Sequence, residues 1–492
     1  MSDYVISIDQ STQGTKALLF ENGGRLICRT DLPHRQIIND NGWISHDPEE
    51  IMRNVIQVVK NLVQKAGIDK NELRVLGISN QRETTVAWDK ETGRPVCDAI
   101  VWQCARAKGI CDRLAPFAAK VRMKSGINLS PYFPAAKIAW ILENVPSARK
   151  LADEGRLATG TIDSWLVWNL TGGREFRTDY SNASRTQLFN IGTLVWDDEL
   201  LNIFGIPKNC MALVTDSDGY YGDTDFNGWL DRRIPIRGVL GDSNGSLFGQ
   251  GCLEKGMIKA TYGTGSSIMM NIGDKPVFSD DGIVTSLAWS MGGKVEYALE
   301  DNFNYTGAVI TWLKNDLKLI SSPNETGELA KAANPADTTY FVPAFSGLGA
   351  PYWDSDAKAA IVGMTRVTGK NEVVRAAVDS IAYQIADAVR LMVETTGIGI
   401  GELRVDGGAT KNDYLMQMQS DIIGIPVKIP NSEELSGIGA AFTAGLAQGI
   451  FDENVFSVLQ RVSYEPKMSE ETRRRKLKGW KRAVEGVMTK EE

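Results

Sequence analysis

Histidine is nearly absent from this chain of 492 residues, which contains only His34 and His46. Histidine is the side chain that most often serves as a general base in enzymes. If the protein catalyses a proton transfer, we therefore expect a carboxylate or a lysine to accept the proton.

Cysteine is sparse too, and the six cysteines include no C-x-x-C pair. This spacing argues against a zinc site and is typical of reduced, mostly buried thiols. Long apolar runs are also missing, since no stretch reaches the roughly eighteen residues of a membrane-spanning helix. The N-terminus, MSDYVISIDQ, lacks the features of a secretory signal. We expect a cytoplasmic protein without a membrane span.

Positive charge is not in excess, because 54 Lys and Arg face 61 Asp and Glu, giving a net charge of −7. That balance argues against nucleic acid as a partner. One basic run, residues 473–482, overlaps apolar residues at helical spacing, namely Leu477, Trp480, Val484 and Met488. It predicts a final amphipathic helix with a solvated basic face.

The length favours two domains, and the order of the expected elements repeats. Strands are expected at residues 4–8 and 16–20 around a polar turn, and a third at 25–29 follows the hairpin signal Asn22-Gly23-Gly24. A helix should then span residues 48–63, with Asp47 as its N-cap.

The second half shows a similar layout. Expected strands lie at 257–262, 266–271, 283–288, 295–299 and 403–405, and helices at 371–395 and from about Asn412. Two α/β halves facing each other would bring their polar turns to one cleft. The best boundary lies near residues 248–256, which divides the chain into an N-terminal domain, 1–250, and a C-terminal domain, 251–492.

Three polar turns follow expected strands. They are Asp9-Gln10-Ser11-Thr12-Gln13-Gly14-Thr15-Lys16, Tyr262-Gly263-Thr264-Gly265-Ser266-Ser267 and Asp406-Gly407-Gly408-Ala409-Thr410-Lys411-Asn412. Glycines allow close approach of a phosphate, and hydroxyl and backbone N–H groups can donate to its oxygens. Each turn alone is equally well explained as an ordinary hairpin or β–α turn. Their repetition in one chain favours a nucleotide site.

Asp242 comes directly after the apolar pair Val239-Leu240 and Gly241. It should therefore lie at the carboxyl end of a strand, where open α/β sheets bind ligands. A carboxylate there can accept a proton from an attacking hydroxyl, although a helix N-cap is the plainer interpretation. Asp9, also at a strand end, suits Mg²⁺, which binds few carboxylates and keeps several waters.

A polyol site requires polar groups in fixed places and an apolar wall. Arg82 and Glu83, in Asn80-Gln81-Arg82-Glu83-Thr84, and Tyr132 can supply the polar groups, and Trp102 the wall. Judged by residue type alone, an exposed salt bridge in a turn and a core tryptophan explain these residues better.

Together these residues resemble the FGGY carbohydrate kinases, and among them most closely the glycerol kinases, over roughly residues 4–485. Two stretches are similar to the family's long signature patterns, residues 132–144 and residues 359–379 with Gly363, Met364 and Glu372. The segments at 77–85, 99–104 and 343–353 are similar to glycerol kinases almost letter for letter. The resemblance implies an actin-like α/β ATPase fold of two ribonuclease-H-type domains around a cleft.

The resemblance also implies roles at matching positions. Arg82, Glu83, Tyr132 and Asp242 would bind the polyol hydroxyls, with Trp102 against its carbons. Asp242 would be the general base, and Asp9 with Asp242 would organise Mg²⁺. The ATP-binding residues would be Ser11, Thr12, Gln13, Lys16, Thr264, Gly265, Gly307, Thr311, Gly408 and Asn412.

The chain departs from that pattern at several places. Ser243 and Ser267 stand in the acceptor site where a glutamine and a phenylalanine are usual, and Thr311 replaces a glutamine near the nucleotide. Two regulatory features of some family members, a fructose-bisphosphate loop near residues 227–233 and a phosphorylated histidine, are not matched.

The resemblance favours ATP-dependent phosphorylation of glycerol to glycerol 3-phosphate. The two serines keep open an alternative acceptor such as erythritol, threitol or xylulose. A non-catalytic sugar sensor or actin-like scaffold is disfavoured, because Asp9, Asp242 and all three glycine turns are present. The sequence leaves a homodimer and a homotetramer equally open.

Overall fold

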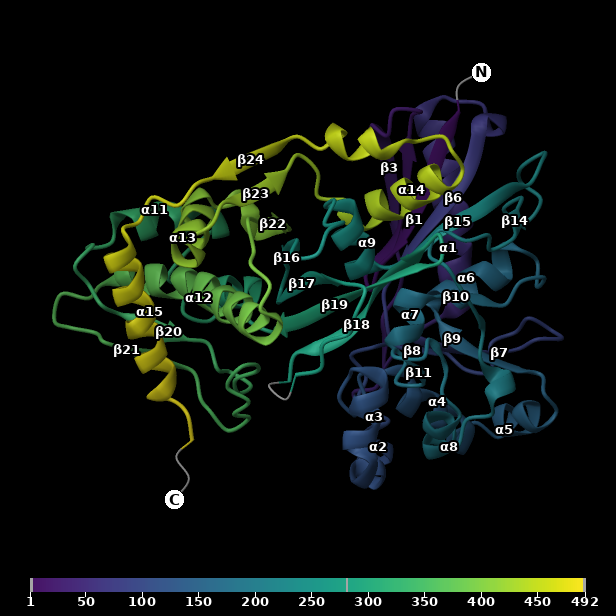
Figure 1. The fold of residues 1–492 in the computed structure, drawn as a ribbon, viewed down its shortest axis with the longest axis horizontal. Helices are drawn as coiled ribbons and strands as arrows, with labels where there is room; N and C mark the ends of the chain where they lie inside the picture. Colours follow the sequence, from purple (N-terminus) through teal and green to yellow (C-terminus); the bar gives the residue numbers. More distant parts are fainter. Residues whose placement is uncertain (1–2, 280–281, 490–492) are drawn as a thin grey trace.

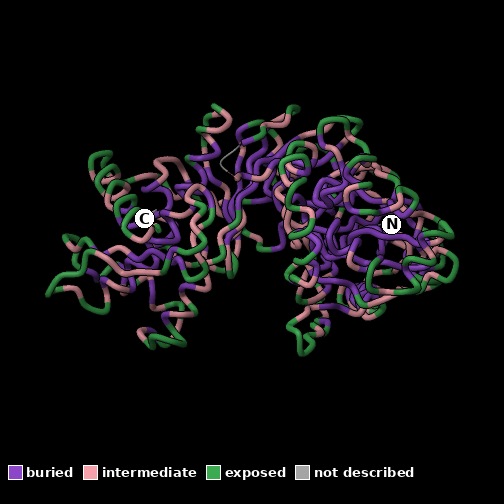
Figure 2. Tube along the Cα trace, turned by 90° about the horizontal axis from the view of Figure 1, so that it is seen from below, coloured by how far each residue is buried: buried purple, intermediate pink, exposed green. Residues whose placement is uncertain are grey.

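The computed structural model describes residues 3–279 and 282–489 of the chain. They form two lobes, each built around a mixed β-sheet, and the first and last parts of the chain reach opposite lobes (Figure 1). Buried residues fill the interior of both lobes and the region where they meet (Figure 2).

The first sheet has the strand order β14-β15-β6-β1-β2-β3. The antiparallel meander β1–β2–β3 lies on one side, and β6 and then β15 continue from β1 in parallel. Its strands are β1 (Tyr4–Gln10), β2 (Gly14–Phe20), β3 (Leu26–Pro33), β6 (Leu73–Asn80), β14 (Asp223–Thr224) and β15 (Ile234–Gly241).

The second sheet repeats this arrangement with the order β18-β19-β17-β16-β22-β23-β24. Here β19, β17 and β16 form the antiparallel meander, and β22 and β23 continue from β16 in parallel. Its strands are β16 (Ile258–Tyr262), β17 (Ser266–Gly273), β18 (Val284–Met291), β19 (Lys294–Phe303), β22 (Leu403–Asp406), β23 (Val427–Pro430) and β24 (Arg461–Tyr464). The internal duplication expected from the sequence is therefore present in the strand order.

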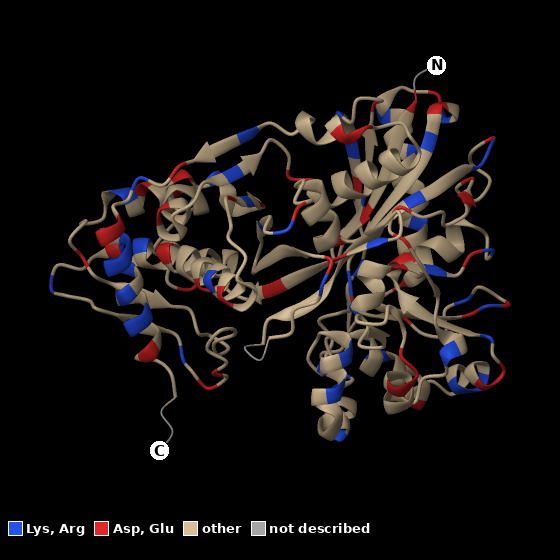
Figure 3. Ribbon diagram, viewed as in Figure 1, with Lys and Arg blue, Asp and Glu red and all other residues tan. Residues whose placement is uncertain are grey.

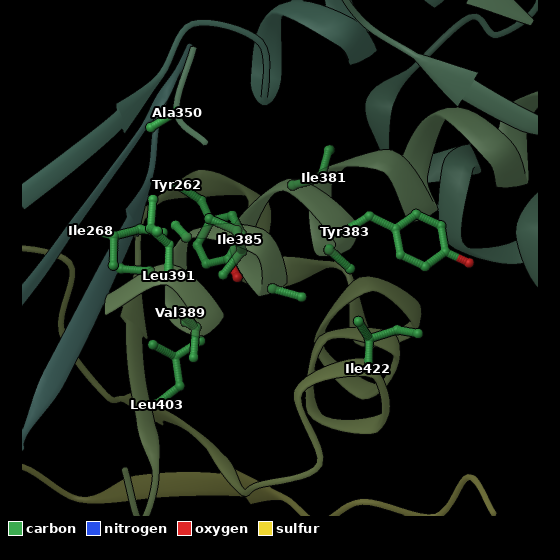
Figure 4. Close-up of a cluster of buried hydrophobic side chains, with 14 of the residues drawn as sticks. Tyr262, Ile268, Ala350, Ile381, Tyr383, Ile385, Val389, Leu391, Leu403 and Ile422 are labelled. Atoms are coloured by element: carbon green, nitrogen blue, oxygen red, sulfur yellow. The ribbon is translucent and has the colours of Figure 1, made fainter. Parts of the chain in front are cut away.

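The helices that cover the sheets follow the expected patterns. In α1 (Pro48–Ala66), the Asp47 side chain accepts the N–H of Glu49 at 2.8 Å, and an apolar stripe is buried against the sheet. The long helix α12 (Lys370–Thr396) packs against the second sheet, where Ile381, Ile385 and Leu391 join Tyr262 and Ile268 in one core (Figure 4). The other large helices are α4 (Pro134–Asn144), α6 (Ile162–Leu170), α9 (Asp242–Gly249), α10 (Gly307–Asn315), α13 (Asp413–Ile423) and α14 (Leu435–Ala447).

Smaller elements complete the lobes, and some of them form a separate sheet of order β4-β5-β8-β7-β9. They are β4 (Ile37–Ile38), β5 (Ile44–His46), β7 (Thr85–Asp89), β8 (Ala99–Ile100), α2 (Lys108–Leu114), α3 (Ala118–Ser125), α5 (Pro146–Asp153), β9 (Leu157–Thr161), β10 (Arg177–Asp179), α7 (Tyr180–Ser184), β11 (Phe189–Asn190), β12 (Val195–Trp196), α8 (Asp198–Phe204), β13 (Leu213–Thr215), α11 (Thr326–Ala332), β20 (Tyr340–Val342) and β21 (Ala360–Val362).

The final amphipathic helix is α15 (Glu470–Glu485). Trp480 and Val484 are buried, while lysines and arginines line its outer side at the edge of the molecule (Figure 3). Among the residues that the structure describes, no helix combines the length and the apolar character needed to cross a bilayer.

Helix α14 comes late in the chain but packs on the first sheet and against α9. Glycines allow both contacts to be close. A Cβ on Gly439 of α14 would lie 1.9 Å from the Gly245 carbonyl oxygen of α9, and a Cβ on Gly77 of β6 would lie 2.3 Å from the Ala440 carbonyl oxygen of α14. A division of the chain into two domains at residues 250/251 stays a prediction. Helix α14 belongs to the second part of the chain but packs on the sheet of the first part.

Candidate functional site

Asp9 and the first polar turn lie where β1 ends. The Asp9 carboxylate accepts the Ser79 hydroxyl at 3.0 Å, and burial raises its pKa to about 6, against the effect of Lys16. The turn is closed by the Ser11 N–H, which donates to the Gly14 carbonyl at 2.9 Å. Asp9 therefore does not cap this turn, and its second oxygen stays 4.0 Å from the Lys16 ammonium.

The second polar turn, between β16 and β17, is also closed by a backbone hydrogen bond. The Gly263 N–H donates to the Gly265 carbonyl at 2.8 Å, and the Thr264 carbonyl accepts the N–H groups of Thr306 and Ala308. These contacts tie the turn to the start of α10. The Thr264 side chain is exposed at the cleft and free to face a ligand.

Asp242 is the first residue of α9, and Gly241, at the end of β15, is the N-cap. Its carboxylate accepts the Ser243 N–H at 2.7 Å and lies 3.5 Å from the Arg82 Nε. Burial raises the pKa of Asp242, and Arg82 opposes that shift. The Asp242 side chain is 36% exposed, so a substrate can reach it.

Arg82 and Glu83 do not form an exposed salt bridge, because they are 5% and 2% exposed. Glu83 has a φ of 59°, in the left-handed region where a residue with a Cβ is strained. Such strain persists where the surrounding structure fixes it, and it concentrates at functional sites.

Two residues that the sequence interpretation missed fix this pair. Glu300, on β19, accepts both terminal nitrogens of Arg82 at 2.9 and 2.5 Å and the Nη1 of Arg185 at 3.0 Å. Arg185 in turn donates through Nε to Glu83 at 2.6 Å. Although burial acts in the opposite direction, Arg185 and Arg82 hold the pKa of Glu300 well below its usual range.

The sequence carried a weak signal for Glu300 and none for Arg185. Glu300 directly follows the strand expected at 295–299, where a charge beside an apolar run indicates a buried partner. Arg185 stands in an irregular polar segment with no periodicity, so nothing in the sequence placed it beside Glu83.

Trp102 and Tyr132 form one wall of the same region, with ring centroids 5.3 Å apart. Trp102 is only half-buried and its Nε1 donates to the Thr12 hydroxyl at 2.9 Å, so it is not a core tryptophan. Beneath them lies the buried Lys137 of α4, which donates to the carbonyls of Glu83, at 3.3 Å, and Tyr132. This lysine was also missed, and burial lowers its pKa to about 7.

A cavity of about 960 Å³ joins these groups. Trp102 and Asp242 line it together with residues of the first and second polar turns, namely Ser11, Thr12, Gln13, Lys16, Thr264 and Gly265. The structure thus gathers six of the ten expected nucleotide residues and two expected acceptor residues, Trp102 and Asp242, around one opening.

The remaining nucleotide candidates lie further along the second lobe. Gly408 and Asn412 line a cavity of about 220 Å³ between α10, α11 and α13. The Asn412 side chain caps α13 and donates to the Thr326 hydroxyl at 3.0 Å. Gly307 begins α10, and Thr311 is exposed with its hydroxyl donating to the Gly307 carbonyl of the same helix.

Ser243 and Ser267 line a third cavity, of about 220 Å³, which Asp9 and Asp242 also border. Asp406 and Gly407, the first two residues of the third polar turn, also line it. No described side chain makes a hydrogen bond to the buried Ser267 hydroxyl.

Comparison with known proteins accounts for this arrangement. Residues 4–249 match the N-terminal domain of the FGGY family of carbohydrate kinases, and residues 258–448 match its C-terminal domain. The chain is 47% identical to glycerol kinase 1 of Thermotoga maritima over 99% of its own length and 100% of that protein. It is also 47% identical to the glycerol kinase of Carboxydothermus hydrogenoformans, over 98% and 97% of the two chains.

Solved structures agree. The crystal structure of Plasmodium falciparum glycerol kinase with ADP has a TM-score of 0.95 and 34% identity, covering 100% of this chain and 99% of that one. A ligand-bound xylulose kinase from Lactobacillus acidophilus, 23% identical over 99% and 98% of the two chains, shares the fold with a TM-score of 0.87. The predicted actin-like α/β architecture and the family resemblance are confirmed, and the chain belongs to the FGGY family of carbohydrate kinases.

Proposed function

We propose that this protein transfers the γ-phosphoryl group of ATP to a hydroxyl of glycerol, forming glycerol 3-phosphate. The observation that carries the proposal is the position of Asp242. Its accessible carboxylate lines the cavity that Trp102 and the first and second polar turns also line, and it lies beside the buried Arg82. The high identity to full-length glycerol kinases supports glycerol as the acceptor.

The acceptor side is rigid before any substrate arrives. Arg82 and Glu83 are locked by Glu300 and Arg185, so their remaining hydrogen-bonding atoms are fixed in space. Such preorganisation lowers the entropy cost of placing a small, flexible polyol. Tyr132 adds a hydroxyl and Trp102 an apolar face, while Ser243 and Ser267 border the neighbouring cavity.

Asp242 acts as the general base. It accepts the proton of the attacking hydroxyl while that oxygen bonds to phosphorus, and the nearby Arg82 keeps the carboxylate charged. Most of the remaining catalysis comes from positioning and charge stabilisation.

The nucleotide extends from the first cavity into the second lobe. Ser11, Thr12, Gln13, Lys16, Thr264 and Gly265 hold the phosphates, and Gly408 and Asn412 border the nucleoside, with Gly307 and Thr311 on the adjoining helix. In this scheme residues 1–250 form the polyol-binding domain, which also contributes the first phosphate-binding turn, and residues 251–492 form the nucleotide-binding domain.

Asp9 and Asp242 would hold Mg²⁺. The residues present fit this assignment, because both carboxylates border one cavity and one Asp9 oxygen accepts no hydrogen bond from any described residue. One or two carboxylates plus phosphate oxygens are the ligands that Mg²⁺ prefers. When bound, the ion neutralises charge on the phosphates.

A coupled assay of ADP release tests the proposal, with glycerol, erythritol, threitol, xylitol and xylulose offered as acceptors. We expect the highest kcat/KM with glycerol. Turnover with a longer polyol but none with glycerol would replace the acceptor and keep the kinase class. Absence of ADP release with every acceptor would refute the proposed function.

A further inference from the structure

Lys259 lies on the cleft face of β16 and has no role in the mechanism above. The residue is 1% exposed. It lines the cavity of about 220 Å³ that Asp242, Ser243 and Ser267 also border. Lys259 therefore shares a cavity with Asp242, the carboxylate that serves as the base in the proposed mechanism.

The Lys259 ammonium makes a single described hydrogen bond, to the Thr261 hydroxyl at 3.0 Å. Among the described residues, no carboxylate lies within 4.0 Å of it. An ammonium group has three donors, so two remain available. A buried charge is costly unless it is paired, and a cation without a partner in a cavity is a binding group for an anion.

The two carboxylates with the strongest electrostatic effect on Lys259, Asp406 and Glu300, are engaged by other groups. Asp406 accepts the Ser246 hydroxyl at 3.2 Å and the Gln250 amide at 3.1 Å, and Glu300 binds Arg82 and Arg185. Burial lowers the pKa of Lys259, and Asp406 opposes this shift from a distance.

The other cations that face the reacting region are also occupied. Lys16 donates to Glu434 at 2.8 Å, and Arg82 is held by Glu300. The register of the second sheet pairs Thr261 with Ser267, whose buried hydroxyl lacks a described partner. Lys259, Thr261 and Ser267 thus offer one charged and two neutral donors on the same face of the sheet.

We infer that Lys259 binds the transferred phosphoryl group, in ATP and in the phosphorylated product. This inference rests on the proposed function, in which the acceptor is a neutral polyol, so that the phosphates are the only anions brought to the site. During transfer the acceptor oxygen bonds to the γ-phosphorus, the bond to the β–γ bridging oxygen breaks and Asp242 takes the proton. Lys259 keeps its own proton throughout and neutralises charge on the phosphoryl oxygens.

The test compares wild type with Lys259→Met, which keeps the length of the side chain and removes the charge. Titration calorimetry with Mg²⁺ measures the affinities for AMP-PNP, which carries a γ-phosphoryl group, and for ADP, which does not. We expect Lys259→Met to weaken AMP-PNP binding at least tenfold and to leave ADP binding within twofold. Its kcat for glycerol should fall at least a hundredfold, while glycerol binding without nucleotide stays within twofold.

Lys428→Met is the matched control. Lys428 lies on β23 of the same sheet and pairs with Glu402 at 2.5 Å, away from the cavity. The Lys428→Met variant should bind AMP-PNP and ADP with wild-type affinity and should have the wild-type kcat for glycerol. If Lys259→Met does not fold, Lys259→Gln takes its place.

Unchanged AMP-PNP affinity in Lys259→Met would overturn the inference. An equal loss of AMP-PNP and ADP affinity would overturn it too, because it would indicate that Lys259 supports the fold and does not bind the γ-phosphoryl group. The nucleotide titrations need no acceptor. A wild-type protein that binds AMP-PNP through Lys259 but does not phosphorylate glycerol would therefore refute only the proposed function.

Discussion

Asp242 illustrates how a single residue balances burial against charge. Burial raises the pKa of its carboxyl group, while Arg82, 3.5 Å away, favours the carboxylate. The result is an accessible carboxylate whose charged form is favoured by Arg82, and the charged form is the one that can accept a proton from the attacking hydroxyl.

Asp242→Asn removes the base while nearly preserving the shape of the side chain. We expect kcat to fall by about 10²–10⁴-fold, the usual contribution of a general base. The melting temperature should change little, because the side chain is partly exposed. Near-wild-type turnover would show that another group accepts the proton.

The histidines predict a pH dependence of stability. His34 and His46 meet edge to face with ring centroids 4.4 Å apart, and burial lowers the pKa of His46 to about 3. The unfolded chain therefore binds a proton near pH 6.5 that the folded chain refuses. Stability should fall as the pH drops below about 6.5, by at most about 1.4 kcal/mol per pH unit from this residue.

Chemical denaturation of wild type and His46→Gln at pH 7 and pH 5 measures this effect. The loss of stability between the two pH values should be smaller in the variant. An identical loss in both proteins would mean that the acid sensitivity comes from other groups.

At the scale of secondary structure, periodicity and turn chemistry predicted most elements near the second polar turn. They also predicted the first residue of α1 and, to within one residue, both ends of α12, although α1 ends three residues later than expected. These features are local, so a sequence can reveal them. The crossing of α14 over α9 was not predictable in the same way. It depends on a contact between Gly245 and Gly439, which lie far apart in the chain.

Gly439→Ala should force the two helices apart, since a Cβ there would lie 1.9 Å from the Gly245 carbonyl oxygen. Overpacking of this kind typically costs about 1–3 kcal/mol. We expect a lower melting temperature by scanning calorimetry.

The matched control is Gly109→Ala in α2, where an added Cβ meets nothing within 4 Å. It should leave stability unchanged or raise it by up to about 1 kcal/mol, because alanine favours helix. Equal effects of the two substitutions would contradict the close-contact account of the crossing.

At the scale of the whole molecule, a buried ionic network joins the two sheets. Glu300 belongs to the second sheet, while Arg82 follows β6 of the first. The sequence supported Arg82, Glu83 and Asp242 as site residues through family resemblance. It could not reveal that Glu300 and Arg185 position them, because ion pairs between distant segments leave no local pattern.

Glu300→Gln leaves two buried guanidinium groups without their shared counter-charge. Removing one member of a buried ion pair costs about 3–5 kcal/mol. We expect a clear fall in melting temperature and a KM for glycerol raised more than the KM for ATP.

Glu143→Gln serves as its control, because the pair of Glu143 with Arg113 is exposed and should contribute less than about 1 kcal/mol. A parallel rise of both KM values in Glu300→Gln would argue that Glu300 supports the fold without positioning the acceptor site.

The central claim, phosphorylation of glycerol by ATP, is tested most directly by ³¹P NMR of the products formed from ATP, Mg²⁺ and glycerol. The structure predicts one equivalent of glycerol 3-phosphate for each ADP. Release of inorganic phosphate with no phosphorylated glycerol would contradict it.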